Sequence, residues 1–420
     1  MRRSIMQSIQ EMGQAAQAAA FTLGQLATTK KNDVLLAMAE ALITATPTIL
    51  AANQKDMTNA TANQVRQVMR DRLKLDAARI AAMATGLRQV ASLADPIGVI
   101  EKGWQTDAGL QVAQQRVPLG VIAMIYEARP NVTVDAAALT FKSGNAVILR
   151  GGKEALQSNM ALATVLQQVL TNFNLPVAAI QLVTDTSHAT AQALMQLNDY
   201  VDVLIPRGSG KFIKTVVQTA TVPVIETGAG NCHIYVDDAA DLAMARDIIV
   251  NAKTQRPAVC NAMEKLVVNQ QVAAEFLPQI AAALAPYNVE LRGDVQAQAI
   301  LPDITPATEA DWSTEYNDYI LAIKVVPDID AAIKHINRYN TKHSEAIITN
   351  DYAHSQQFTK QIDAAVVYVN ASTRFTDGFE FGFGAEIGIS TQKLHARGPM
   401  GLTALTSTKY VVRGAGQIRQ

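Results

Sequence analysis

From residue 119 onward the chain alternates short, wholly apolar runs with amphipathic helical segments, and this alternation limits the folds open to it. The first apolar runs, none of which alternates with polar residues, are 119–126, 146–150, 179–183 and 202–205. Strands of this kind belong to parallel sheets that helices cover on both faces. A second series of runs and helices follows Asp237 and predicts a second α/β domain.

Size and charge narrow the class of protein further. A chain of 420 residues exceeds what one hydrophobic core usually serves, so we expect more than one domain. Thirty-six Lys and Arg against 37 Asp and Glu create no overall field, and we expect neither nucleic acid nor membrane as a partner. No apolar run reaches the roughly 18 to 20 residues that span a bilayer. Two cysteines are too few for a disulfide scaffold, which predicts a cytoplasmic protein.

One cysteine lies in a setting that suits a nucleophile. Cys260 follows Pro257, which ends the preceding helical pattern, and Arg256 and Lys253 are close in sequence. Nearby cations favour the thiolate form. The alternative is a buried cysteine with a packing role, which is common for this residue type. Cys232 has less to recommend it.

Two glycine-rich stretches resemble nucleotide-binding motifs without matching them. Residues 228–233 lack the third small residue of a dinucleotide fingerprint, and in residues 206–212 a phosphate loop would need Gly at Ile205 and Ser or Thr at Phe212. What remains is a turn at Gly208 and Ser209 before a predicted helix, which can present backbone N–H groups to a dinucleotide phosphate. A tight turn without a ligand is the alternative.

Cations also follow the second predicted strand. Arg150, Gly151 and Lys153 lie at its carboxyl end, the edge where open α/β sheets bind ligands, and the two cations suit an adenosine 2′-phosphate. A solvated strand end is the alternative. The six histidines show no metal-ligand spacing, so we predict no metal.

Six segments taken together, in order and spacing, resemble γ-glutamyl phosphate reductases of the aldehyde dehydrogenase superfamily. The segments are VPLGVIAMIYEARPNVTVDAAALTFKSGNAVILRGGKEA, VLIPRGSG, HIYVDD, NAKTQRPAVCNAMEKL, AVVYVNASTRFTDG and STQKLHARGPMGLTAL. The resemblance implies an α/β, aldehyde dehydrogenase-like fold with two parallel-sheet domains and a small oligomerisation element. The implied ranges are 1–104 and 119–227 for an NADP-binding domain, 228–394 for a catalytic domain, and 105–118 and 395–420 for the oligomerisation element.

The same resemblance assigns roles to residues. Cys260 corresponds to the catalytic cysteine, and Asn131 to the asparagine whose amide stabilises the oxyanion, although Asn131 also suits a helix cap. Glu315 corresponds to the glutamate that holds the nicotinamide ribose, with a surface carboxylate as the alternative. Glu226 stands where hydrolytic relatives carry a general base, but Glu-Thr-Gly-Ala replaces Glu-Leu-Gly-Gly here, so it is equally read as structural.

The full set of predicted site residues follows. The cofactor side comprises Arg150, Gly151, Lys153, Gly208, Ser209, Glu226, Gly228 and Glu315. The substrate side comprises Arg129, Arg256, Ser372, Thr373 and Arg374.

The implied reaction is NADPH-dependent reduction of L-glutamyl 5-phosphate to L-glutamate 5-semialdehyde through a Cys260 thioester, the second step of proline biosynthesis from glutamate. A hydrolytic or CoA-dependent aldehyde dehydrogenase, in which Glu226 activates water, is the alternative. We expect a homo-oligomer, either dimer or tetramer, and a contact with glutamate 5-kinase.

Overall fold

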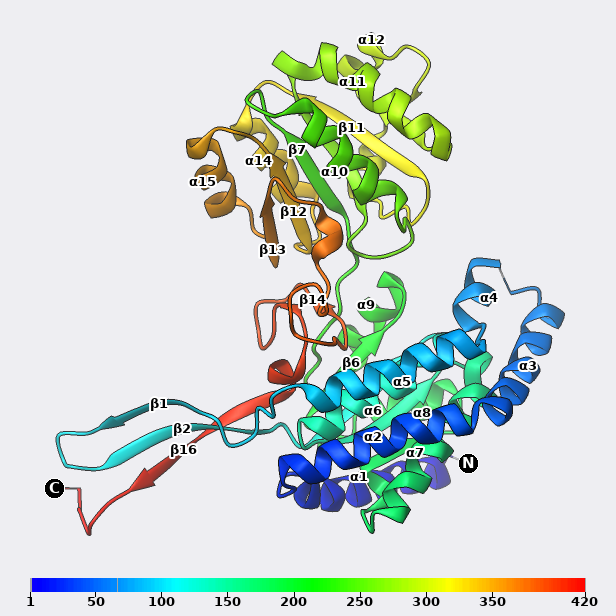
Figure 1. The fold of residues 1–420 in the computed structure, drawn as a ribbon, viewed down its shortest axis with the longest axis vertical. Helices are drawn as coiled ribbons and strands as arrows, with labels where there is room; N and C mark the ends of the chain where they lie inside the picture. The colour runs from blue at the N-terminus through cyan, green and yellow to red at the C-terminus, as the bar shows by residue number, and fades with distance from the viewer. Residues whose placement is uncertain (1, 66, 420) are drawn as a thin grey trace. The chain divides into compact units, whose positions relative to one another are not determined.

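The computed structural model describes residues 2–65 and 67–419 and divides the chain into two compact units (Figure 1). Unit 1 comprises Met1–Glu226, Gly382–Gly388 and Met400–Gln420, and unit 2 comprises Thr227–Phe381 and Ile389–Pro399. Met1, Arg66 and Gln420, which the predicted domain ranges include, lie outside the described residues.

A four-stranded parallel sheet forms the centre of unit 1. Its strands, in the order β5-β4-β3-β6, are β5 (Ile180–Leu182), β4 (Ala146–Gly151), β3 (Val121–Tyr126) and β6 (Val203–Arg207). All six residues of β3 are buried, as its continuous apolar sequence requires for a central strand. The crossovers bring the carboxyl ends of β4, β3 and β6 to one edge.

Helices surround this sheet. They are α1 (Arg2–Leu23), α2 (Thr28–Thr44), α3 (Thr46–Ala62), α4 (Gln67–Leu73), α5 (Ala77–Ser92), α6 (Asn131–Lys142), α7 (Leu156–Asn172), α8 (His188–Met195) and α9 (Gly210–Thr219). Helix α1 contacts β3, β4 and β5, while α6 contacts β3 and β4. Among the described residues no single helix is long and apolar enough to cross a membrane, although α2 and α3, bent by 66°, reach that length and hydropathy as a pair.

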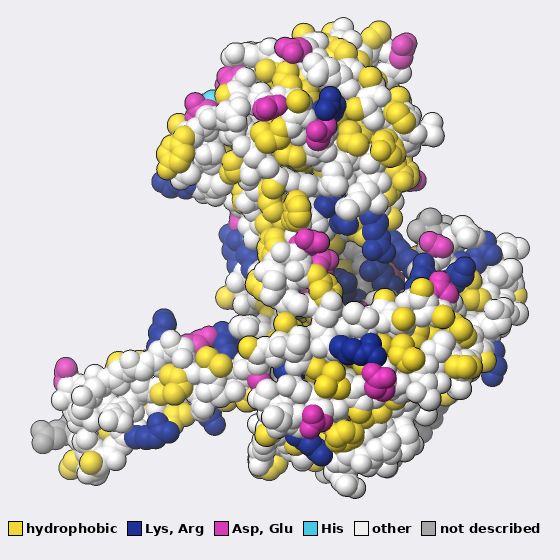
Figure 2. All heavy atoms as spheres, in the orientation of Figure 1, with side chains coloured by type: hydrophobic (Ala, Val, Ile, Leu, Met, Phe, Trp, Pro, Cys, Tyr) yellow, Lys and Arg dark blue, Asp and Glu magenta, His cyan; other side chains and the backbone are white. Residues whose placement is uncertain are grey.

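A long three-stranded antiparallel arm also belongs to unit 1 (Figure 1). It consists of β1 (Ile100–Gln105), β2 (Gln111–Pro118) and β16 (Thr406–Arg413), with β2 in the middle. Gly109, at φ 79, allows the tight turn between β1 and β2. The visible face of the arm carries scattered hydrophobic side chains among polar and basic ones (Figure 2), and Trp104 and Tyr410 pack edge to face with ring centroids 6.1 Å apart.

Unit 2 is built on a seven-stranded parallel sheet of order β10-β9-β11-β8-β7-β12-β13. The strands are β7 (Cys232–Val236), β8 (Met263–Asn269), β9 (Glu290–Gly293), β10 (Thr305–Pro306), β11 (Ile320–Val326), β12 (Ser344–Ile348) and β13 (Val366–Val369). A small ladder pairs β14 (Ile389–Ser390) with β15 (Gly398–Pro399).

Helices cover both faces of this second sheet. They are α10 (Leu242–Thr254), α11 (Gln270–Leu284), α12 (Val295–Ile300), α13 (Glu309–Ser313), α14 (Ile329–Tyr339) and α15 (Tyr352–Gln361). One buried apolar cluster joins the sheet to α10, α11 and α12, and another joins it to α14 and α15. Unit 2 is therefore a three-layer α/β structure with one core on each side of the sheet.

The predicted α/β class with two parallel-sheet units is confirmed, and each of the four apolar runs that opened the sequence analysis is a strand. The ranges differ from expectation in four places. Residues 100–104, which were predicted in the cofactor domain, pair with β2 in the arm, and residues 382–388 belong to unit 1. Thr227, predicted in the cofactor domain, and residues 395–399, predicted in the oligomerisation element, belong to unit 2.

Candidate active site

Cys260 lies in the turn between α10 and β8, and its surroundings hold the backbone of that turn tightly. The carbonyl oxygen of Cys260 accepts a hydrogen bond from the Cys232 thiol at 3.2 Å. Cys232 is fully buried, and burial raises its pKa, so its thiol keeps the proton that it donates. A methyl group on Gly230 would lie 1.4 Å from the same carbonyl oxygen, so only glycine fits there. Cys260 itself is partly exposed.

Glu315 lies next to this turn. Its Oε1 accepts the Gly230 N–H at 2.7 Å, which joins the carboxylate to the residue that touches the Cys260 backbone. The structure thus brings the predicted residues Cys260 and Glu315 close together, with Gly230 between them and Cys232 bonded to the Cys260 carbonyl. Neither Gly230 nor Cys232 was predicted as a functional residue.

The cations around Cys260 differ from those expected. Lys253 is buried, and its Nζ donates to the Met263 carbonyl at 3.0 Å and contacts Glu264 at 3.2 Å. Arg374 binds the side chain of Asn261, the residue after Cys260. Burial and the neighbouring Arg256 lower the pKa of Arg374, whereas negative charge on Cys260 raises it.

Ser372 and Thr373, predicted to bind substrate, are buried and bonded within the protein. The Ser372 hydroxyl donates to Asn251 Oδ1 at 2.8 Å, and the Thr373 hydroxyl donates to the Asn261 carbonyl at 2.8 Å. Asn261 directly follows Cys260, and its Oδ1 also accepts from Arg374. The Thr373 and Arg374 contacts hold the residue that follows Cys260, and the Ser372 contact joins the same segment to α10.

Unit 2 contains a polar cavity of about 340 Å³ beside this segment. Its lining comprises Asn251, Gln255, Arg374, Phe375, Asp377, Phe379 and Glu380. Arg374 is fixed there by a hydrogen bond from its Nε to Gln255 Oε1 at 3.0 Å. The cavity thus offers one oriented cation and two carboxylates.

The predicted cofactor residues of unit 1 lie at the carboxyl edge of its sheet. Arg150 is half-buried, and its Nη2 donates to the carbonyls of Thr186 at 2.5 Å and Ser187 at 3.3 Å. Burial lowers the pKa of Arg150, which Glu154 and Asp185 partly offset. A methyl group on Gly151 would lie 2.1 Å from Asn159 Nδ2, so glycine is required by packing. Lys153 is exposed.

Gly208 and Ser209 form the turn before α9, as predicted, but a carboxylate already occupies it. Glu127 Oε2 accepts the Ser209 N–H at 2.8 Å, and Oε1 accepts the Ser209 hydroxyl at 3.3 Å. An anionic oxygen pair therefore fits at this helix N-terminus, which is what a dinucleotide phosphate requires. Sequence reasoning missed Glu127 because nothing in its local pattern shows that it reaches Ser209, 82 residues away.

Asn131 is exposed at the first position of α6, where the N-cap is Pro130. Its Nδ2 donates to Asp135 Oδ2 at 2.8 Å, so the helix-cap alternative is wrong and the amide is an oriented donor. Burial raises the pKa of Asp135 to about 6, against the lowering effects of Asn131 and Arg207. Arg129 lies just before this helix and is partly exposed.

Glu226 and Gly228 stand on either side of the boundary between the units. Glu226 ends the first segment of unit 1 and is partly exposed. The Gly228 N–H donates to the Ile389 carbonyl at 2.9 Å, and a methyl group there would meet Thr391, so this glycine serves the local ladder.

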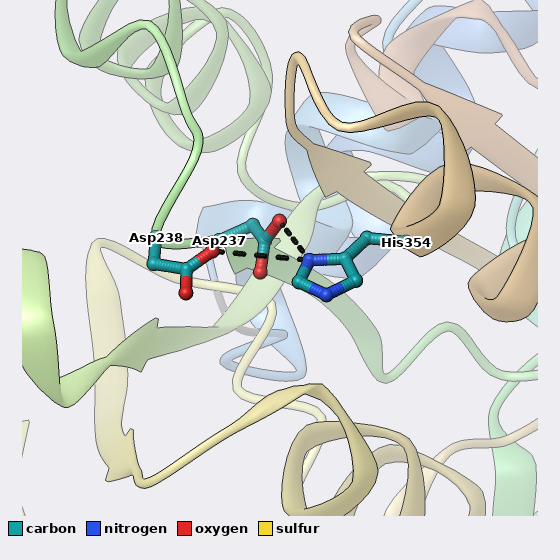
Figure 3. Close-up of side chains that lie close together, drawn as sticks. All are labelled: Asp237, Asp238 and His354. Carbon is teal, nitrogen blue, oxygen red and sulfur yellow. Dashed lines mark hydrogen bonds and ion pairs between the residues drawn. The ribbon is translucent and has the colours of Figure 1, made fainter.

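A cluster of possible metal ligands lies elsewhere in unit 2, formed by Asp237, Asp238 and His354 (Figure 3). Asp237 Oδ2 accepts from His354 Nδ1 at 2.7 Å and from the Thr349 hydroxyl at 2.7 Å, and its Oδ1 accepts from Tyr235 at 3.0 Å. These bonds satisfy both oxygens of Asp237. The cluster connects the ends of β7 and β12 to α15.

Comparisons with known proteins agree with this arrangement. The sequence matches the aldehyde dehydrogenase family over residues 2–307 and 299–411. It is 63% identical over 414 residues to a γ-glutamyl phosphate reductase of Lactiplantibacillus plantarum, covering 99% of this chain and 100% of that protein. It is 66% identical over 412 residues to one from Lacticaseibacillus casei, covering 98% of each. The crystal structure of γ-glutamyl phosphate reductase from Thermotoga maritima superposes with a TM-score of 0.96 at 46% identity, covering 98% of this chain and 100% of that one.

Proposed function

The chain belongs to the aldehyde dehydrogenase family and groups with its γ-glutamyl phosphate reductases, and from that membership we propose that it reduces L-glutamyl 5-phosphate to L-glutamate 5-semialdehyde with NADPH. The observation that carries the proposal is the turn at Cys260, where the thiol is partly exposed, the backbone is fixed by Cys232 and Gly230, and Arg374 binds the side chain of the next residue, Asn261.

The first step acylates the enzyme. The Cys260 thiolate attacks the γ-carbonyl carbon, a C–S bond forms, and the C–O bond to phosphate breaks so that inorganic phosphate leaves with the electron pair. The Asn131 amide and the Cys260 backbone N–H donate to the oxyanion during the attack. Arg374 and Arg256 offset the negative charge that gathers around the sulfur and the phosphate.

The second step reduces the thioester. When bound, NADPH supplies a hydride for the thioester carbon. Glu315 would hold the nicotinamide end of the cofactor by accepting hydrogen bonds from its ribose, and Asn131 would again donate to the oxyanion. The C–S bond then breaks, the aldehyde leaves, and Cys260 is released as a thiolate. No deacylating water is needed, so Glu226 has no role as a general base in this direction.

The phosphorylated end of the cofactor fits unit 1. Arg150 and Lys153 provide positive charge for the 2′-phosphate, which favours NADPH over NADH. The Ser209 N–H and hydroxyl, which donate to the Glu127 carboxylate, would donate to a diphosphate oxygen if that carboxylate moved away.

The cavity at Arg374 suits the amino-acid end of the substrate. An α-carboxylate pairs with the Arg374 guanidinium, and an α-ammonium pairs with Asp377 or Glu380. A simple aliphatic aldehyde would offer these charged groups no oppositely charged partner. The cavity therefore supports a zwitterionic substrate.

The proposal extends to assembly and compartment. We infer a homo-oligomer, dimer or tetramer, that forms through the arm, because Trp104, Tyr410 and Val412 are 47%, 64% and 53% exposed there. Two cysteines without a disulfide are consistent with a cytoplasmic enzyme. A contact with glutamate 5-kinase, which would make the acyl phosphate, stays a prediction.

One assay tests the reaction in reverse. Glutamate 5-semialdehyde and NADP should give NADPH only when inorganic phosphate is present, and Cys260→Ser should abolish that signal. Reduction of NADP without phosphate, or only with CoA, would instead identify a hydrolytic or CoA-dependent aldehyde dehydrogenase.

A further inference from the structure

A buried lysine contacts both neighbours of Glu315. Lys265, on β8, is 1% exposed, and its Nζ donates to the Thr314 carbonyl at 2.8 Å. The same Nζ lies 4.2 Å from the centroid of the Tyr316 ring, which is a cation–π distance. Thr314 and Tyr316 are the residues before and after Glu315, so one ammonium group contacts the chain on both sides of Glu315.

Glu264, the residue before Lys265, also contacts this segment. Glu264 is also buried, and its Oε1 accepts the Asn317 N–H at 3.0 Å. Its Oε2 contacts Lys253 Nζ at 3.2 Å, and Lys253 donates in turn to the Met263 carbonyl. The two lysines balance the charge of Glu264, and each buried group has at least one partner, which is the condition for keeping charges in a core.

The Glu315 carboxylate makes one hydrogen bond through Oε1, and its second oxygen, Oε2, can accept another. Its Oε1 accepts the Gly230 N–H at 2.7 Å, so the carboxylate lies against the residue that touches Cys260. The loop at 314–317 has no regular secondary structure to fix it. The Tyr316 hydroxyl donates to Asp311 Oδ1 at 2.6 Å and the Thr314 hydroxyl to the Ala310 carbonyl at 2.7 Å, which tie the segment to α13. The contacts from Lys265 and Glu264 hold its backbone on the side of β8.

We propose that Lys265 and Glu264 are positioning residues that hold the segment 314–317 so that Glu315 presents its second oxygen, Oε2, to the nicotinamide ribose. The inference rests on the proposed function of Glu315. Neither positioning residue touches the cofactor. Their effect on the reaction passes through the carboxylate that they orient.

The charge state of Lys265 gives the arrangement a pH dependence. Burial lowers the pKa of Lys265 to about 8, with Lys253 acting in the same direction and Glu264, Asp311 and Cys232 opposing. Glu345 and His233 also interact with its charge. Above that pH Lys265 loses one proton and becomes a neutral amine, which removes the positive charge needed for the cation–π contact with Tyr316, so NADPH binding should weaken.

The test measures NADPH dissociation constants by fluorescence titration with the full chain, without turnover. Lys265→Met should raise the constant roughly tenfold, as expected for loss of a charged hydrogen bond. Glu315→Gln provides the reference, because glutamine has a single amide oxygen, which the Gly230 N–H takes. If Lys265 acts through Glu315, the double variant should bind NADPH no more weakly than Glu315→Gln alone.

Lys324→Met is the matched control. Lys324 forms an ion pair with Asp294 at 2.9 Å and lies 5.7 Å from the Trp312 ring, so it has the same kinds of contact in the same unit without touching 314–317. Its variant should bind NADPH like the parent. Hydrogen exchange of the Asn317 amide, measured without cofactor, should speed up in Lys265→Met and stay unchanged in Lys324→Met.

A second pair of variants covers the case in which Lys265→Met does not fold. Tyr316→Phe keeps the ring under the ammonium and should bind NADPH better than Tyr316→Leu, which removes it. Normal NADPH binding by Lys265→Met, or additive losses in the double variant, would overturn the positioning role while leaving the proposed function intact. Normal binding by Glu315→Gln would remove the role of Glu315 and the inference with it.

Discussion

Replacing Gly230 by alanine should damage the active site far more than its one added methyl group suggests. The new Cβ would lie 1.4 Å from the Cys260 carbonyl oxygen, whereas real Cβ contacts stay beyond 3.0 Å, so that oxygen has to move by about 1.6 Å. Both neighbours are backbone, and no flexible side chain can yield. A displacement of about 1 Å at a reacting group typically costs about 100-fold in rate, so kcat/KM should fall at least that far. The Gly230 bond to Glu315 would be strained as well.

The assay separates misplacement from unfolding. Alkylation of Cys260 by iodoacetamide reports the thiol, since Cys232 is fully buried, and thermal unfolding followed by circular dichroism reports the fold. Gly86→Ala is the matched control, because a methyl group there meets nothing within 4 Å, and alanine in the middle of α5 should stabilise by about 0.5–1 kcal/mol. A folded Gly230→Ala enzyme with near-native kcat/KM and alkylation would refute the reasoning.

Three further predictions concern other contacts. Asn131→Ala should lose about 2.7 to 4 kcal/mol of barrier lowering in kcat at saturating substrate, whereas an unchanged kcat would exclude an oxyanion donor. The bond to Asp237 is the main cause that raises the pKa of His354, so stability from this pair is complete below the unfolded value near pH 6.5 and is lost as pH rises through the folded pKa. Urea unfolding across pH 6 to 9 should show that loss in the parent but not in His354→Gln. Asp56→Ala should destabilise by roughly 1 to 3 kcal/mol, because the buried Asp56 carboxylate accepts the Ser158 N–H and hydroxyl at 2.8 and 2.6 Å; a smaller change in urea midpoint would count against it.

Central strands of both sheets could be predicted because a strand that is buried on both faces needs a continuous run of apolar residues. The run at 121–126 is the clearest case, since every residue is buried. Strand β1 has no such run of apolar residues. All six of its residues are exposed, and Lys102 and Trp104 carry no pattern that separates a two-sided exposed strand from a loop.

Site residues could be proposed from the sequence where the residue type itself suggests a chemical role. They could not be proposed where the role depends only on which distant residues the side chain contacts. Cys260 stands in one of the segments that carry the resemblance, and Glu315 was assigned by its correspondence to the family's glutamate, so both could be proposed from the sequence. Lys265 and Gly230 act through contacts with residues 49 and 30 positions away, and a single sequence holds no sign of such pairings. The helix-cap alternative for Asn131 failed for a similar reason, because Pro130 took the cap position.

The three-stranded arm can form only late in synthesis, because β16 is far from β1 and β2 in the sequence. Strand β2 is flanked by β16, and the pair begins with Pro118 opposite Thr406, 288 positions later in the chain. At about 5 to 20 residues per second a ribosome needs roughly 15 to 60 s to cover that distance. Throughout that interval β2 offers an uncovered row of N–H and C=O groups to any other nascent strand. A message truncated shortly before codon 406 would therefore yield a chain that has both parallel sheets but lacks β16. The edge of β2 would then stay unpaired and prone to aggregation.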